Sequence, residues 1–230
     1  MMIKPFKKIL IFAAHQDDET IGCGGSIKKW SSLGSKVNVV FMTDGATGID
    51  QQHSVNQHNV RSIRMDEATE ASLLLGINKI KSLEIECQNI QNSKDTFHKV
   101  IKEIRNFKPD LVITHYKNDK HRDHRTTSEI VKEACWKANE NIHPELGRCH
   151  KIKDLWAFEI TDLLPRIDIA VDTTETHKHK VRAMKVYNSQ KNVIEGILGH
   201  IDGLSKVRGY SIGKKHAEGF MRLYDVPIIN

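Results

Sequence analysis

The chain has 230 residues, of which 39% are hydrophobic and 28% charged, and its formal net charge is +6. No apolar run approaches the roughly 20 residues that cross a bilayer, so we expect no membrane span. The basic charge permits contact with nucleic acid, but the lysines are scattered among acids and only 6% of residues are aromatic. No nucleic-acid-binding signature is present, and we expect no nucleic-acid partner.

The four cysteines stand apart, at positions 23, 87, 135 and 149, and form no C-x-x-C pair. Such spacing predicts free thiols in a reducing compartment, so we expect a cytoplasmic protein. Linkers and internal repeats are absent, and the length suits one domain over residues 1–230. The sequence leaves the oligomeric state, monomer or homo-oligomer, open.

Strand and helix patterns alternate along the first half of the chain. Residues 7–14 (KKILIFAA) form an apolar run that is typical of a buried strand. The first half predicts, in order, strand 7–14, helix 24–33, strand 36–45, helix 60–76, strand 82–86 and helix 96–107.

The second half continues the alternation. It predicts strand 110–116, helix 126–140, strands 155–160 and 167–172, and helices 173–190 and 193–204. A capping-box pattern, Thr126-x-x-Glu129, indicates where the helix after strand 110–116 begins. Residues 216–226 fit a short helix or a strand. The alternation predicts an α/β fold with a mainly parallel sheet covered on both faces, and a C-terminal helical extension.

Two polar clusters follow strands of this predicted sheet. The first, His15-Gln16-Asp17-Asp18-Glu19, comes directly after strand 7–14, and the second, His121-Arg122-Asp123-His124, follows strand 110–116. Ligands of open parallel sheets bind beyond the carboxyl ends of the strands. If the two strands are near neighbours, both clusters converge on one crevice.

The residue types in these clusters favour a metal site. Two histidines and a carboxylate are usual ligands of catalytic zinc, and a fourth position stays open for water. A spare carboxylate can accept a proton from that water, and a spare histidine can stabilise charge. The adjacent aspartates make sense if Asp18 faces a cation and Asp17 faces the water.

At these motifs the sequence resembles the PIG-L/LmbE family of zinc-dependent N-deacetylases, which carries A-H-P-D-D-E after its first strand and H-x-D-H after a later one. Weaker similarities extend over nearly the whole chain. They are GCGGSI at residues 22–27, Arg64-x-x-Glu67, Leu75-Gly76, Ser189-Gln190 and Ala217-Glu218-x-Phe220.

The resemblance implies a Rossmann-like three-layer α/β sandwich and a role for each motif residue. His15, Asp18 and His124 would bind Zn²⁺, and Asp17 would be the general base. His121 would polarise or protonate the reacting amide, with Asp123 orienting it, and Arg64 is a candidate substrate contact.

The same resemblance implies the substrate, an N-acetylated sugar or glycoside of the N-acetylglucosamine type. Two positions depart from the family pattern. Gln16 replaces the usual proline, which removes a fixed φ angle, and Arg122 stands where proline is common.

Other interpretations compete with this one. A Rossmann-type dinucleotide-binding protein without hydrolase activity would use GCGGSI and Asp44, but Ile27 stands where that pattern needs a small residue. A second alternative is a basic, non-catalytic module that binds nucleic acid or another anionic polymer, but such a function does not explain the two polar clusters. Arg64 and Glu67 can form a plain helix ion pair, and His115, at a strand end, fits a structural role better than a metal ligand.

Overall fold

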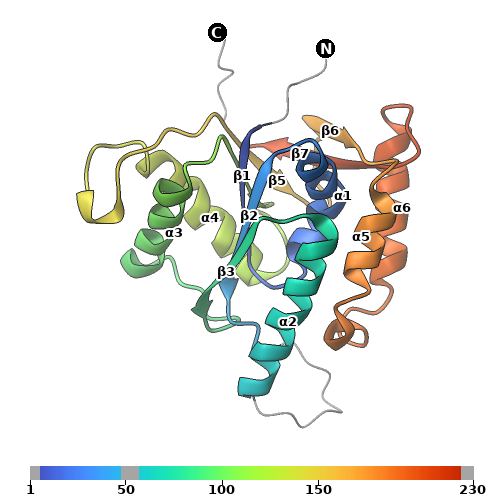
Figure 1. The fold of residues 1–230 in the computed structure, drawn as a ribbon, viewed down its shortest axis with the longest axis horizontal. Coiled ribbons are helices and arrows are strands. Elements are labelled where there is room, and N and C mark those ends of the chain that lie inside the picture. The colour runs from blue at the N-terminus through green and yellow to red at the C-terminus, as the bar shows by residue number, and fades with distance from the viewer. Residues whose placement is uncertain (1–5, 48–56, 224–230) are drawn as a thin grey trace.

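The computed structural model describes residues 6–47 and 57–223, and these form a seven-stranded sheet with helices on both faces (Figure 1). The strands are β1 (Lys8–Ala13), β2 (Lys36–Thr43), β3 (Lys79–Ile85), β4 (Leu111–His115), β5 (Asp154–Phe158), β6 (Ile169–Asp172) and β7 (Ala217–Arg222). The helices are α1 (Asp18–Ser32), α2 (Gln57–Leu75), α3 (Lys94–Phe107), α4 (Arg122–Lys137), α5 (His177–Met184) and α6 (Ile197–Tyr210), with short 3₁₀ turns η1 (Pro144–Leu146) and η2 (Asn188–Gln190).

The sheet has the order β3-β2-β1-β4-β5-β7-β6. Strands β1 to β5 are parallel, and β7 pairs antiparallel with β5 and with β6. The predicted mainly parallel α/β fold is therefore confirmed. Segment 216–226, which the sequence left undecided, supplies strand β7.

Alternating side chains of the central strands face two separate cores. In β1, Leu10 and Phe12 join the core under α3 and α4, whereas Ile9 and Ile11 join the core under α1 and α2. Both faces are buried because parallel strands are covered by helices on either side. Figure 1 shows α3 and α4 on one face and α1, α2 and α5 on the other.

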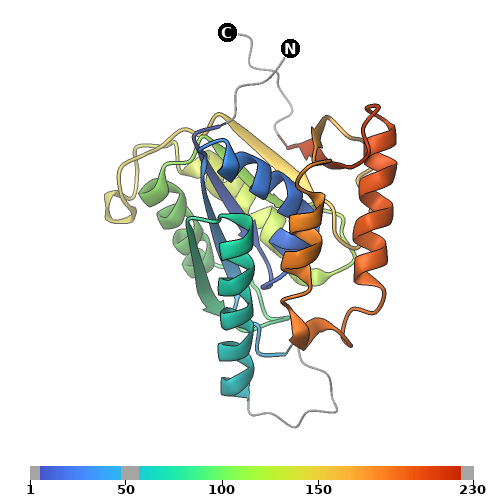
Figure 2. The ribbon, with the colours of Figure 1, turned by 45° about the vertical axis from the view of Figure 1, so that its right-hand side comes forward.

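The C-terminal helices are less of an extension than the sequence suggested. Helix α5 packs against α1 and α2 within the same layer, and α6 lies outside it, against α5 and β7 (Figure 2). The predicted helix 173–190 is wrong in length, since α5 ends at Met184 and a turn of 3₁₀ helix follows. Among the described residues, no helix is long and apolar enough to cross a bilayer.

Helices α1 and α4 begin earlier than predicted, each inside one of the two polar clusters. Helix α1 starts at Asp18, not near Gly24, because the amide of Ile21 already donates to the carbonyl oxygen of Asp17 (2.9 Å). Helix α4 starts at Arg122, so the capping box at Thr126 is wrong: the Thr126 hydroxyl donates back to the Arg122 carbonyl oxygen from inside the helix.

Candidate active site

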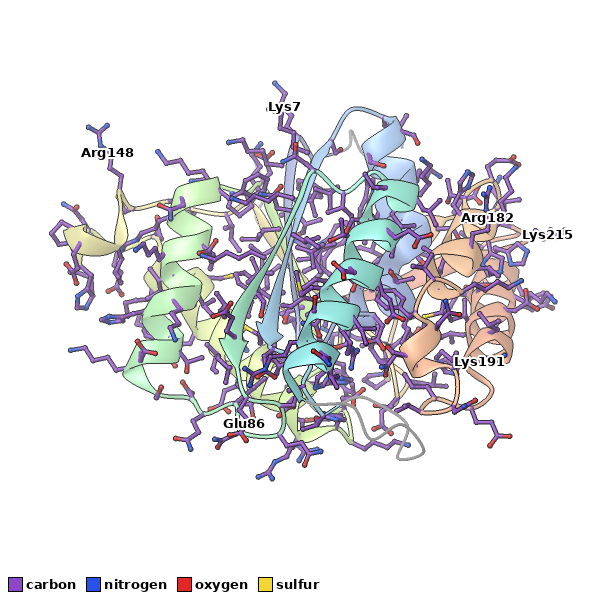
Figure 3. The ribbon with its side chains drawn as sticks, turned by 60° about the horizontal axis from the view of Figure 1, so that its bottom comes forward. Lys7, Glu86, Arg148, Arg182, Lys191 and Lys215 are labelled. Atoms are coloured by element: carbon purple, nitrogen blue, oxygen red, sulfur yellow. The ribbon has the colours of Figure 1, made fainter. Side chains whose placement is uncertain are left out.

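Both polar clusters lie at one edge of the sheet. Strands β1 and β4 are direct neighbours and pair in parallel from Ile9 with Leu111 to Ile11 with Ile113. The residues that follow them therefore emerge side by side. Figure 3 shows this end of the molecule towards the viewer: Glu86, which follows β3, lies there, and Lys7 lies at the opposite end.

The first cluster forms a strained turn from β1 into α1. Asp17 is the N-cap of α1 and has a φ of 139°, a backbone conformation that residues other than glycine rarely adopt. Such strain costs about 1–3 kcal/mol and gathers at functional sites. Asp18 and Glu19 occupy the first helical turn, where the helix dipole favours negative charge.

Asp18 is buried and lies among three imidazoles. Its Oδ2 is 3.3 Å from His15 Nδ1 and 3.3 Å from His115 Nε2, and its Oδ1 is 3.3 Å from His124 Nε2. Burial opposes ionisation of this carboxyl, but the charge of His124 and the contact with His115 hold the pKa of Asp18 well below its usual range. An ionised carboxylate facing several ring nitrogens is a donor set that suits a divalent transition metal.

Two overlapping groups of ligand atoms converge here. One consists of His15, His121 and His124, and the other of Asp18, His115 and His124; within each group the atoms lie within 4.8 Å of one another. His115 was expected to be structural, and its Nε2 does accept the amide of Ala14 (2.8 Å). This hydrogen bond occupies the lone pair of the nitrogen that faces Asp18, so His115 is engaged by the backbone and leaves the other histidines to face a metal.

Buried carboxylates hold the far side of two of these histidines. Asp123 Oδ2 lies 3.0 Å from His15 Nε2, and Asp119 Oδ1 lies 3.1 Å from His124 Nδ1. This carboxylate–histidine arrangement is the usual support of metal-binding imidazoles, because it fixes the ring and its tautomer.

The position of Asp123 differs from the sequence-based expectation. Its carboxylate contacts His15 and accepts the amide of Gln88 (2.8 Å), whereas only its backbone amide contacts His121. Asp123 therefore orients His15 rather than His121. Burial lowers the pKa of His15, but Asp123 and Asp18 together raise it to about 10. Metal binding to this ring would have to displace a proton.

Asp119 is a residue that the sequence analysis missed. It is buried, and it accepts hydrogen bonds from the backbone and hydroxyl of Thr161 and from the amide of His121 (2.8 Å). Burial works against its ionisation, but the hydrogen bonds from His124 and Thr161 hold the pKa of Asp119 below its usual range. No motif marked it, and its only sequence signal is an acid two residues before His121.

His121 is the N-cap of α4 and is half-buried. Its Nδ1 accepts the amide of Asp123 (3.2 Å), and its ring stacks on His124 with centroids 4.6 Å apart. Among the described residues, its Nε2 has no hydrogen-bond partner, and the side chain lines a cleft. This nitrogen is therefore available to a ligand.

Asp17 and Arg64 form a buried pair beside this cleft. Arg64 Nη2 lies 3.3 Å from Asp17 Oδ2 and also donates to the carbonyl oxygen of Gln16. Burial raises the pKa of Asp17 to about 7, although the Arg64 guanidinium opposes the shift. The alternative ion pair of Arg64 with Glu67 does not form, since Glu67 accepts the backbone amide and the hydroxyl of Ser189.

Gln16 stands where the family pattern has proline, and its side chain is fully buried. The amide nitrogen donates to the Thr43 carbonyl oxygen (3.1 Å), and the side chain lies against Gly45, which has a φ of 73°. A Cβ on Gly45 would fall 2.4 Å from Gln16 Oε1. Gln16 therefore ties the turn after β1 to the end of β2, a connection that a proline ring cannot make.

The glycine-rich segment does not form a phosphate site. Helix α1 kinks at Cys23, which frees the next backbone amides, and Glu218 of β7 accepts those of Gly25 (2.9 Å) and Ser26 (2.6 Å). Asp44 is occupied as well, because it pairs with Arg61 (2.6 Å). The groups that a dinucleotide would contact are thus bound within the protein, which argues against the dinucleotide-binding alternative.

A cleft of about 500 Å³ opens over the cluster. It is lined by His15, Asp17, Asp18 and His121, and by residues of the segment from η2 into α6. The volume is typical of a site for a small organic molecule. The charged groups thus face a space into which a substrate can enter.

The family model described as PIG-L, GlcNAc-PI de-N-acetylase, matches residues 10–135, more than half of the chain. The chain belongs to this family, as its two motifs led us to expect. A diacetylchitobiose deacetylase of Thermococcus kodakarensis is 26% identical, over 93% of this chain and 82% of the relative. A probable N-acetyl-alpha-D-glucosaminyl L-malate deacetylase of Bacillus cereus is 24% identical, over 80% of this chain and 84% of that protein.

Solved structures agree on the fold. The N,N'-diacetylchitobiose deacetylase of Pyrococcus horikoshii, in complex with an inhibitor, superposes with a TM-score of 0.86 at 27% identity, over 95% of this chain and 84% of that one. The 4-carboxy-2-hydroxymuconate hydratase of Pseudomonas putida superposes with a TM-score of 0.85 at 22% identity, over 97% and 99% of the two chains. Since a hydratase has the same fold, the fold alone does not define the reaction.

Proposed function

We propose that this protein is a zinc-dependent hydrolase that removes an acetyl or similar acyl group from the nitrogen of an N-acetylglucosamine-type sugar or glycoside. One observation carries the proposal: the Asp18 carboxylate lies 3.3 Å from His15 and from His124, and the neighbouring Asp17 lines the same cleft. Deacetylases among its relatives, named for diacetylchitobiose and for an N-acetylglucosaminyl malate, support the substrate class.

The residues fit a zinc ion. His15 Nδ1, an oxygen of Asp18 and His124 Nε2 would hold it, while Asp123 and Asp119 fix the two imidazole rings from behind. When bound, zinc would polarise the amide carbonyl and lower the pKa of a water molecule to about 7.

Asp17 is the residue best placed to accept the proton of the attacking water. It lines the cleft, and burial brings its pKa to about 7, the range in which a carboxylate works as a base near neutral pH. Arg64 also lines the cleft, but its Nη2 is engaged by Asp17 and by the Gln16 carbonyl oxygen, so we assign Arg64 to positioning Asp17 and keep it as a candidate substrate contact.

His121 presents its free Nε2 to the cleft, where it can donate a hydrogen bond to the carbonyl oxygen of the amide. Water adds to the carbonyl carbon, the carbon–nitrogen bond breaks, and a carboxylic acid and a free amine leave. Asp17 or His121 returns the proton to the amine.

The buried free thiols of Cys23, Cys87 and Cys135 fit a reducing compartment, and we propose that the protein resides in the cytoplasm.

Amine release from a panel of N-acetylated sugars tests this function. The panel holds N-acetylglucosamine, its β-glycosides and N,N'-diacetylchitobiose, each offered to metal-free protein and to protein reloaded with one to two equivalents of zinc. We expect zinc-dependent release of amine and acetate in equal amounts from at least one sugar. Zinc-loaded protein that releases no amine, but hydrates an unsaturated carboxylic acid, would replace the deacetylase assignment with a hydratase.

A further inference from the structure

A second cluster of metal-ligating side chains lies outside the candidate active site. It consists of His177 at the start of α5, Asp202 in α6 and His216 just before β7, and it shares no residue with the first cluster. One ligand atom from each residue lies within 4.8 Å of those of the other two. Neither the family motifs nor the proposed function uses these residues.

The two imidazoles are stacked and aligned. Their centroids are 4.0 Å apart, their planes differ by 6°, and both side chains are buried. Ser205 Oγ lies 2.9 Å from His216 Nδ1, which fixes that ring, and no hydrogen bond to Nε2 occurs within the described part of the chain, so Nε2 is available to a ligand. Two parallel rings that present nitrogens to one carboxylate form a preorganised nitrogen and oxygen donor set.

The hydrogen bonds within the cluster leave one ring nitrogen of His177 without a partner among the described residues. His177 Nε2 lies 3.3 Å from Asp202 Oδ1, yet the buried His177 Nδ1 has no hydrogen-bond partner among the described residues. Buried polar atoms are nearly always paired. The cluster is therefore incompletely satisfied as a purely structural network.

Asp202 gives the cluster an opening to solvent. Its side chain is 42% exposed, and its Oδ2 is neutralised by Lys206 (2.6 Å), which leaves Oδ1 to face His177. In Figure 3, Lys215, the neighbour of His216, lies on the outer flank of the C-terminal helices, away from Glu86. A metal ion would reach this place without passing through the substrate cleft.

We propose that His177, Asp202 and His216 bind a zinc ion at a second, non-catalytic site. Three protein ligands would leave one position to water. Such an ion joins α5, α6 and the start of β7 through side chains. Because Ile197 and His200 of α6 line the substrate cleft, the ion would stabilise one wall of that cleft without touching the substrate.

Metal counting in variants tests the second site. Asp202→Asn removes the carboxylate from an exposed helix position, and His177→Gln removes a ring. His179→Gln, two positions further along α5, is the matched control. Each variant is made in the wild-type and the Asp18→Ala backgrounds, dialysed with excess zinc and then desalted. Zinc per chain and the zinc-induced rise in Tm are measured, and circular dichroism checks the fold.

We expect two zinc ions per wild-type chain, one in Asp18→Ala, and none when Asp202→Asn or His177→Gln is added to it. The zinc-induced rise in Tm of Asp18→Ala should disappear with them and persist with His179→Gln. If the folded double variant Asp18→Ala/Asp202→Asn bound as much zinc as Asp18→Ala, the second site would be overturned. If only the proposed active-site zinc were wrong, wild-type protein would bind one zinc ion, and Asp18→Ala would still bind that ion.

Discussion

At the scale of single residues, the site is built from carboxylates with different environments. Asp18 is held ionised by the surrounding histidines, whereas burial raises the pKa of its neighbour Asp17 to about 7. Adjacent carboxylates whose pKa values are pushed apart can serve separate roles, one as a metal ligand and one as a proton acceptor. The two side chains have different partners, since Asp17 contacts Arg64 whereas Asp18 contacts the histidines.

Arg64 sets the pH dependence of this arrangement. Its guanidinium favours the ionised form of Asp17, so Arg64→Met should raise the pKa of Asp17 further. Since a base must be ionised to act, the acid limb of the kcat/KM profile should move to higher pH by about 1–3 units. Arg64→Lys keeps the positive charge, so its acid limb should lie close to that of wild type. Arg61→Met, on the same helix but paired with Asp44, should not move the profile. An unmoved limb in Arg64→Met at equal zinc content would contradict this role.

Asp119 is a positioning residue for His124. Asp119→Ala should weaken zinc binding about 10–100-fold, because His124 loses the carboxylate that fixes its ring. Asp119→Asn keeps one acceptor oxygen and should recover part of the affinity. Competition with a chromophoric chelator measures both, and Asp95→Ala, at an exposed site, serves as the control. Equal zinc affinity in Asp119→Ala and wild type would refute the assignment.

At the scale of elements, β7 and α1 depend on each other. Glu218 of β7 accepts two amides at the kink of α1 and pairs with Lys180 of α5 at 2.7 Å, and both side chains of this ion pair are buried. These contacts form only in the folded protein, so the sequence could not decide between a helix and a strand for residues 216–226. A charged residue inside a strand is ambiguous until the partners of its carboxylate are known.

Glu218→Ala should lower the free energy of unfolding by about 3–5 kcal/mol, because it leaves the Lys180 ammonium buried and unpaired. Adding Lys180→Met should recover part of the loss by removing that charge. Lys81→Ala breaks the half-exposed pair with Glu103 and should cost no more than about 1 kcal/mol. Denaturant unfolding compares the three, and a Glu218→Ala loss as small as that of Lys81→Ala would contradict the coupling.

At the scale of the whole molecule, the sequence predicted what depends on local pattern and on strand topology. The apolar runs placed β1 and β4, and the parallel sheet brought His15 and His124 to one edge. Contacts formed only by folding were beyond it: the carboxylate of Asp123 on His15, the support of His124 by Asp119, and the link from Gln16 to β2. The start of α4 was predicted wrongly because the side chain of His121, a residue of the site, caps that helix.

The rate of amine release by zinc-matched wild-type and Asp17→Asn protein tests the central claim most directly. Asparagine keeps the size of Asp17 but cannot accept the proton of water. With equal zinc content, turnover of an N-acetylglucosamine-type substrate should therefore fall about 10²–10⁴-fold. Near-normal release of amine by Asp17→Asn would contradict the proposed role of this cluster.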